Sequence, residues 1–297
     1  MNIINEIKAS FKKGDYLVKL IYINVAVFLI VNIVNVVSAL FALNISGALL
    51  DWMAMPAYLP QLAWRVWTPI TYMFLHEGFM HLLFNMLWLF WMGRIFVEYL
   101  GPHKLLSVYL VGGLAGAGLY VLAFNVLPVF HPSVFETGLI LGASGAVMAV
   151  VMGIAAYLPD YTIHLMFIGP VRLKYVALAM IVLDVIGIAG SNAGGHIAHI
   201  GGAALGAIWG YRLGQGTDLL KPVHPLLFSL TKLFTPKPVI RVHYRTDERF
   251  GHLRAEPRTP SQKEMDPILD KIAKSGYDSL TKDEKNILFR MSNRPEA

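Results

Sequence analysis

Long apolar stretches between residues 16 and 213 constrain the fold of this chain more than any other feature. A helix that crosses a bilayer needs roughly 17–25 apolar residues, and the last three stretches are short enough to suit helices partly enclosed by others. The sequence therefore predicts an all-α membrane protein with a bundle of six transmembrane helices, at Tyr16–Leu43, Met80–Leu100, Leu105–Leu127, Ala143–Leu158, Leu173–Gly190 and Ile197–Leu213.

Charge is unevenly distributed, and this divides the chain. Hydrophobic residues make up 56% of the 297 positions and charged residues only 15%, against about 25% in soluble domains. Of the 44 charged side chains, 26 follow Gly216. We therefore expect a membrane domain over 1–215, a surface helix with a flexible linker over 216–262, and a small helical domain over 263–297.

The net charge of +6 and the absence of cysteine bear on which partners and metal sites are expected. Cytoplasmic loops and an interfacial tail explain the basic side chains, so nucleic acid is not an expected partner. Disulfides and thiolate metal sites are excluded. Residues 1–15 are polar and lack a small-residue cleavage site, so no removable signal peptide is predicted.

Lysine and arginine collect in alternate connections between the apolar stretches, which sets the orientation. The third and fifth connections contain neither residue, and the first contains only Arg65. Both termini are therefore predicted to be cytoplasmic. The basic residues on that side are Lys8, Lys12, Lys13, Arg94, Lys104, Arg172, Lys174, Arg212 and Lys221.

The first connection, Asn44 to Phe79, is long and aromatic. Tryptophan and tyrosine favour the membrane–water interface. We expect the loop to lie in the outer leaflet, with an interfacial belt of Trp52, Tyr58, Trp64, Trp67 and Tyr72.

A serine opens the fourth apolar stretch, in Gly142-Ala143-Ser144-Gly145-Ala146. The first turn of a helix has free backbone N–H groups that can bind an oxyanion, and the small neighbours leave room for a carbonyl. The soluble Gly-x-Ser-x-Gly elbow differs, because position 146 is alanine and no strand is expected before Ser144. The alternative is a small-residue helix contact in which Ser144 is incidental.

His199 lies beside a stripe of small residues in the sixth stretch: Ala198, Gly202, Gly206 and Gly210. Such a stripe lets two helices approach closely. If the fourth stretch is the partner, His199 can reach Ser144 and act as general base. The alternative is a structural histidine bonded to a backbone carbonyl.

His81 and Asn85 lie four residues apart at the start of the second stretch, so they share a helix face. Both can donate hydrogen bonds to a tetrahedral oxyanion. A polar pair that bridges helices is the alternative.

Three further polar residues have structural interpretations. His76 and His196 are expected to make polar contacts near the external end of the bundle. A zinc site is not favoured, because no His-Glu-x-x-His motif is present. Asp184 is able to orient His199, but a helix-end contact with backbone or water is the favoured interpretation.

Together these residues resemble the rhomboid family of intramembrane serine proteases, of the bacterial type with a small C-terminal cytoplasmic domain. The resemblance covers roughly residues 15–215. It rests on pieces in the family's order: Trp64-Arg65, His76, His81 with Asn85, Glu98, Gly142-Ala143-Ser144-Gly145, and Ala198-His199 with Gly202 and Gly206.

The resemblance implies a Ser144–His199 dyad without a required Asp, and an oxyanion hole of His81, Asn85 and the Ser144 N–H. No cofactor or metal is expected. It implies supporting roles for the other matched residues, single-span membrane proteins as substrates, and a bacterial cytoplasmic membrane. Many members carry an aromatic residue where this chain has Met148, whose thioether can contact a ring. A catalytically inactive binder on the same scaffold is the alternative. A transporter is disfavoured because no inverted repeat is visible.

The tail contains no apolar span. A surface helix is predicted around Leu226, Leu227, Leu230, Leu233 and Phe234, followed by a linker from Pro236 to Gln262. A helical hairpin follows, whose first helix is expected to begin at Asp266-Pro267 and end at Gly276. Thr281 and Glu284 form a predicted capping box for the second helix. No binding partner is predicted for this C-terminal domain.

Overall fold

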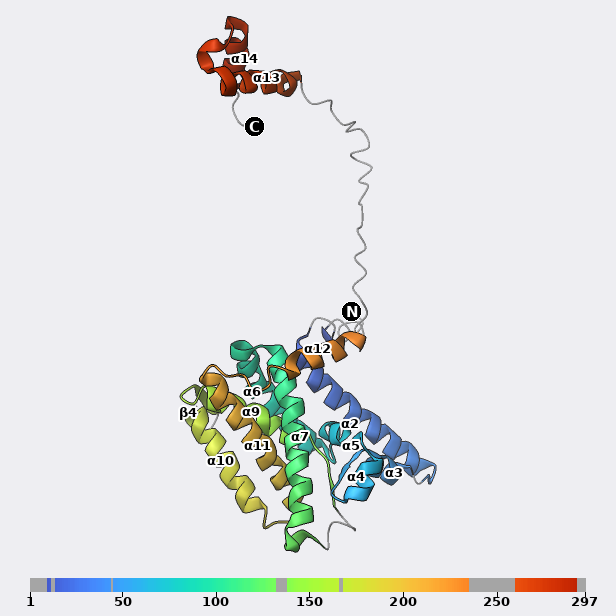
Figure 1. Cartoon of the computed structure of the whole chain (residues 1–297). Coiled ribbons are helices and arrows are strands. Elements are labelled where there is room, and N and C mark those ends of the chain that lie inside the picture. Colours follow the sequence, from blue (N-terminus) through green and yellow to red (C-terminus); the bar gives the residue numbers. More distant parts are fainter. Residues whose placement is uncertain are drawn as a thin grey trace. The chain divides into compact units, whose positions relative to one another are not determined.

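The structure is a computed structural model that describes residues 10–11, 14–43, 45–131, 138–165, 168–234 and 260–292. The chain divides into two compact units, residues 1–236 and 237–297 (Figure 1). Most of the predicted linker lies outside the described residues.

The first unit is built from long helices that follow the predicted apolar stretches. Three of them, α2, α6 and α7, are long and apolar enough to cross a membrane, and α9 is a shorter apolar helix. The chain is thus a mainly helical membrane protein, as predicted. The helices are α2 (Tyr16–Leu40), α6 (Phe79–Leu100), α7 (Pro102–Val126), α9 (Ser144–Tyr157), α10 (Leu173–Gly187) and α11 (Ala193–Gly214).

Local sequence explains where these helices begin and end. The Asp15 carboxylate accepts a hydrogen bond from Val18 N at 3.1 Å and caps α2. Between α6 and α7, Gly101 adopts φ +86° and Pro102 opens the next helix. Glycine tolerates this left-handed backbone, and proline suits a first helical position. The two helices therefore form a tight hairpin.

The connection before α6 contains short elements rather than an irregular loop. Trp52 and Trp64 are exposed, and the rings of Trp52 and Trp67 lie 4.5 Å apart. The interfacial interpretation is wrong for Tyr72, which is only 2% exposed and donates its hydroxyl to the Gly113 carbonyl at 2.6 Å. The elements are α3 (Ser46–Met53), β1 (Met55–Pro56), α4 (Leu59–Trp64), α5 (Thr68–Thr71) and η1 (Tyr72–Phe74).

Two short antiparallel sheets accompany the helices, which keep the predicted mainly helical class. β1 pairs with β2 (Leu139–Ile140), and β3 (Thr162–Leu165) pairs with β4 (Gly169–Arg172). A strand therefore does precede Ser144, because the backbone of β2 forms hydrogen bonds with β1 in the first connection. Strands of only two to four residues leave too little periodicity in the sequence to reveal them. The short η2 (Pro128–Phe130) follows α7.

Glycine brings α9 and α11 into backbone contact. A Cβ added at Gly202 would lie 2.0 Å from the Gly145 carbonyl oxygen. At Gly206 and Gly210 the corresponding distance is 2.1 Å, to the carbonyl oxygens of Ala149 and Gly153. No real Cβ tolerates such distances, so the stripe sets this interface, and the predicted pairing of the two helices is confirmed. Helix α7 packs against both.

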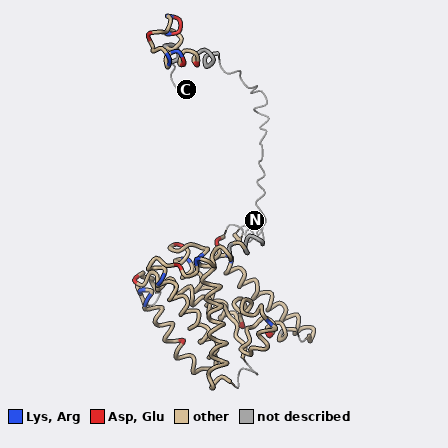
Figure 2. Tube along the Cα trace, in the orientation of Figure 1, with Lys and Arg blue, Asp and Glu red and all other residues tan. Residues whose placement is uncertain are grey.

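Charged side chains gather at one end of the first unit, around the α6–α7 connection and the β3–β4 hairpin (Figure 2). There the exposed Asp160 carboxylate contacts Lys174 and Arg172, at 2.7 and 3.2 Å. These contacts, with Lys174 first, lower the pKa of the Asp160 carboxyl.

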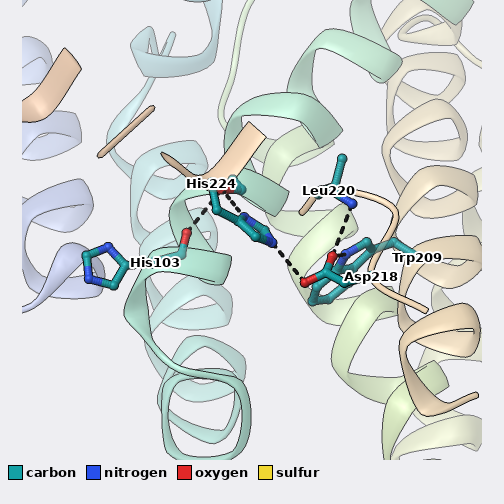
Figure 3. Close-up of polar contacts among 6 residues, drawn as sticks. His103, Trp209, Asp218, Leu220 and His224 are labelled. Carbon is teal, nitrogen blue, oxygen red and sulfur yellow. Dashed lines mark hydrogen bonds and ion pairs between the residues drawn. The ribbon is translucent and has the colours of Figure 1, made fainter. Parts of the chain in front are cut away.

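A polar cluster attaches α12 (Val223–Phe234), the predicted surface helix, to the same end. The Asp218 carboxylate accepts hydrogen bonds from Trp209 Nε1 at 2.9 Å and His224 Nε2 at 3.0 Å. Nδ1 of His224 lies 2.6 Å from Ser107 Oγ on α7. Figure 3 shows His224 reaching toward Asp218 beside the Trp209 indole. His224 thus joins α12 to α7 and to the end of α11.

Asp218→Ala is expected to lower the free energy of unfolding by about 1–3 kcal/mol, because the buried Trp209 N–H loses its acceptor. Burial raises the pKa of the Asp218 carboxyl, but hydrogen bonds from Trp209 and His224 outweigh it and lower the pKa from 3.8. The stabilisation is therefore complete above pH 3.8 and lost as the pH falls through the lower folded-state value. Thermal unfolding in detergent measures both effects. Asp160→Ala, which removes an exposed pair, should change the midpoint little.

The second unit is a helical hairpin of α13 (Pro260–Ser275), η4 (Tyr277–Ser279) and α14 (Lys282–Ser292). The predicted start at Asp266-Pro267 is wrong: α13 begins at Pro260, which takes the favoured first position, and Pro267 lies inside the helix. The predicted stop is confirmed, since Gly276 has φ +77°. The capping box is confirmed too, with Thr281 N to Glu284 Oε2 at 2.7 Å and Glu284 N to Thr281 Oγ1 at 3.3 Å.

Candidate active site

A cavity of about 450 Å³ lies among α6, α9, α10 and α11. It brings together the polar residues singled out in the sequence, from four separate helices. Its lining includes His81, Asn85, Ser144, Met148, Asp184 and His199.

Ser144 is the first residue of α9, as predicted, so its backbone N–H lies in a turn without intrahelical partners. Gly142 has φ +134° and donates its N–H to the Tyr72 carbonyl at 2.9 Å. A Cβ at Gly142 would lie 2.9 Å from His81 Nε2 and 3.4 Å from Ser144 Oγ. Glycine at 142 therefore keeps open the space between imidazole and hydroxyl, where a carbonyl oxygen has room.

His81 and Asn85 project from the first two turns of α6 into the cavity. Asn85 Nδ2 donates one hydrogen bond to the His81 carbonyl at 2.8 Å. A carboxamide carries two N–H donors, so a second remains for a ligand. The His76 and His81 rings lie 5.1 Å apart. The predicted polar contact of His76 is absent among the described residues, where both of its ring nitrogens are buried without a hydrogen-bond partner.

His199 is held by an acid from the neighbouring helix. Nδ1 of His199 lies 2.7 Å from Oδ1 of Asp184, and Nδ1 of His196 lies 2.8 Å from the same oxygen. A carboxylate only accepts hydrogen bonds, so both Nδ1 atoms carry the donated proton. The neutral ring of His199 then has an unprotonated Nε2, the form a general base needs. This contact replaces the favoured helix-end interpretation of Asp184.

Ser144 and His199 line the same cavity, but no hydrogen bond joins their side chains in the described part of the chain. Catalytic hydrogen bonds are often long without substrate and tighten when it binds. Met148 lies one turn after Ser144, is 3% exposed, and packs with Met152 and Ala203 beside the cavity. The flexible thioether of Met148 therefore lines the cavity at the position where the resemblance leads one to expect an aromatic ring.

The remaining matched residues lie elsewhere. Trp64 is 84% exposed at the end of α4, and Arg65 Nη1 donates to the Asp51 carbonyl. Glu98 is exposed near the far end of α6 and is not among the residues that line the cavity. Gly145, Gly202 and Gly206 act through the α9–α11 contact. An acid within an apolar span marks a functional site by default, and this is the signal in the sequence that points to Asp184.

Fold and cavity together define an integral membrane protein whose helix bundle encloses a polar site with a hydroxyl, imidazoles and a carboxamide. The Rhomboid domain family matches residues 63–216. Because this match covers more than half of the chain, the protein belongs to the rhomboid family, as the sequence analysis predicted. A family of unknown function, DUF6576, matches residues 246–294.

Curated relatives agree with this assignment. RHOMBOID-like protein 12, mitochondrial, of Arabidopsis thaliana is 33% identical over 161 residues, which are 51% of this chain and 48% of that protein. Rhomboid protease AarA of Providencia stuartii is 34% identical over 157 residues (49% and 54%). Rhomboid protease GlpG of Haemophilus influenzae is 32% identical over 156 residues (52% and 73%). The chain spans about half the length of the first two.

Proposed function

We propose that this protein is an intramembrane serine endopeptidase that cleaves single-span membrane proteins in or near the bilayer. One observation carries the proposal. Asp184 holds Nδ1 of His199 at 2.7 Å, which leaves Nε2 as a proton acceptor in the cavity that also contains Ser144. The names of the relatives AarA and GlpG, both called rhomboid protease, support it.

In the proposed reaction, Ser144 Oγ attacks the carbonyl carbon of the scissile peptide bond while His199 Nε2 takes the hydroxyl proton. The oxyanion accepts hydrogen bonds from the Ser144 N–H, the second Asn85 N–H and His81. The carbon–nitrogen bond breaks as His199 returns the proton to the leaving amine. Water, deprotonated by His199, then attacks the acyl-enzyme and regenerates Ser144.

We further propose that all six helices of the first unit cross the membrane, with both termini cytoplasmic. Charged residues gather at the end of the bundle where α9 leads into β3, whereas Ser144 begins α9, and this supports the orientation (Figure 2). A bacterial cytoplasmic membrane is the proposed location, although relatives include mitochondrial proteins. The second unit is then a cytoplasmic domain behind a linker, and its partner is unknown.

The rival function is a rhomboid-like scaffold that binds membrane proteins without cutting them. Two observations favour it: the described residues contain no Ser144–His199 hydrogen bond, and Met148 stands beside the cavity. The two functions differ in one chemical property, the nucleophilicity of Ser144.

Covalent labelling with a fluorophosphonate probe separates these functions. An activated Ser144 is expected to form a stable phosphonate ester, visible by gel fluorescence and located by mass spectrometry of the peptide that contains Ser144. Ser144→Ala serves as the unlabelled control, and Ser107→Ala, which removes a buried hydroxyl far from the cavity, should still be labelled. A wild-type protein that resists the probe while remaining folded would favour the scaffold.

A further inference from the structure

One imidazole beside the cavity has no part in the proposed chemistry. His196 does not line the cavity, yet its Nδ1 lies 2.8 Å from the Asp184 oxygen that also holds His199. Asp184, His196 and His199 each offer one ligand atom, and these three atoms all lie within 4.8 Å of one another. Two imidazoles and a carboxylate therefore converge on one point.

The packing of α10 fixes the second imidazole in this arrangement. A Cβ added at Gly187 would lie 2.4 Å from Cε1 and Nε2 of His196, so the ring rests against helix backbone that only glycine leaves open. His196 and His199 stand three residues apart on α11 and share a face. Both rings are thus held with Nδ1 toward Asp184, which is 6% exposed.

We propose that Asp184, His196 and His199 form a binding site for Zn²⁺, and that the bound ion inhibits the enzyme; the inhibition, though not the binding, rests on the proposed function. Zinc takes imidazole and carboxylate ligands, and three protein ligands leave a fourth position for water. Tetrahedral bonds of 2.0–2.2 Å place ligand atoms about 3.4 Å apart. The two Nδ1–Oδ1 distances of 2.7 and 2.8 Å are shorter because they are hydrogen bonds, so zinc binding displaces both Nδ1 protons and widens these contacts.

Zinc in this position stops proton transfer for a simple reason. When Nδ1 of His199 binds the ion, the ring proton must lie on Nε2. Nε2 then donates a hydrogen bond and cannot accept the Ser144 proton. The ion also engages the Asp184 carboxylate that otherwise selects the active tautomer. Metal binding and general-base catalysis therefore exclude each other.

The test measures metal binding and serine reactivity separately on the full chain in lipid nanodiscs. Competition against a chromophoric chelator should reveal one high-affinity Zn²⁺ per chain, and Co²⁺ substitution should give visible absorption typical of tetrahedral nitrogen and oxygen ligands. Because the chain has no cysteine, thiolates cannot contribute. Saturating Zn²⁺ should slow fluorophosphonate labelling of Ser144 at least tenfold, and EDTA should restore it.

His196→Ala and His196→Gln provide the decisive comparison, since neither replacement can ligate through imidazole. Both should weaken Zn²⁺ binding by at least about 100-fold, more than the 10–100-fold typical for residues that only hydrogen-bond to a metal's ligands. Both variants should also remain labelled by the probe in saturating zinc. His164→Ala, in the distant β3 strand, should behave like wild type. Wild-type protein without a stoichiometric site, or His196 variants that bind Zn²⁺ like wild type, would overturn the proposal. A wild type that binds zinc but is never labelled would refute the proposed function and the inhibition, and leave the site standing.

Discussion

Ser144→Ala is expected to abolish cleavage of a co-expressed single-span membrane protein. Without the hydroxyl no acyl-enzyme can form, and removal of the nucleophile from a serine hydrolase lowers kcat by about 10⁶-fold. Immunoblotting of full-length and shortened substrate gives the result in cells, and purified protein in nanodiscs gives the rate. Ser144 is partly exposed to the cavity and caps no other group, so the thermal unfolding midpoint should stay near that of wild type. Cleavage that continues unchanged in this variant would refute the assignment of Ser144.

Combined variants test whether the site acts as a unit. Adding His199→Ala to Ser144→Ala should cost little more than either change alone, because nucleophile and base work in the same step. Asp184→Asn should reduce the rate by about 10⁴-fold, the loss expected when the orienting acid no longer selects the histidine tautomer. Additive losses would show that the residues contribute independently.

Gly206→Val is expected to prevent the first unit from assembling. The new Cβ would lie 2.1 Å from the Ala149 carbonyl oxygen, and backbone cannot move aside as a flexible side chain can. Separating α9 from α11 to relieve the overlap would open the most closely packed interface in the described bundle and should cost more than about 3 kcal/mol. Yield after detergent extraction and the thermal unfolding midpoint measure the effect.

Gly118→Val is the matched control for this change. Gly118 lies on α7, and nothing is within 4 Å of a Cβ added there. The same substitution should therefore leave yield and unfolding midpoint close to wild type. Equal behaviour of the two variants would mean that the small-residue stripe does not determine the packing of α11.

The sequence predicted those features that repeat or that cap an element. The stripe at every fourth residue revealed the α9–α11 contact, because close approach demands small residues at that spacing. Ser144 was placed correctly since a helix start has its own signature, and Gly276 and Thr281 marked a stop and a cap for the same reason.

Single contacts between residues far apart in the chain could not be predicted from the sequence. The sequence pattern does not show whether Asp184 contacts His199 or water, because the contact depends on how α10 packs against α11. Tyr72 is aromatic like its neighbours, but it is buried in the core and donates its hydroxyl to the Gly113 carbonyl on a distant helix. The start of α13 was missed because two prolines, Pro260 and Pro267, both suit a first helical position.

The length of α9 has a consequence for water supply. Fourteen residues at 1.5 Å each span about 21 Å, whereas the hydrocarbon core is about 30 Å thick. In the proposed orientation, with the charged end of the bundle at one surface, Ser144 therefore lies well below the other. The cavity of about 450 Å³ has room for several water molecules, since one needs only about 10–15 Å³ of accessible volume. In the proposed reaction each turnover consumes one water molecule, which is replaced through the open side of the cavity before the next cut.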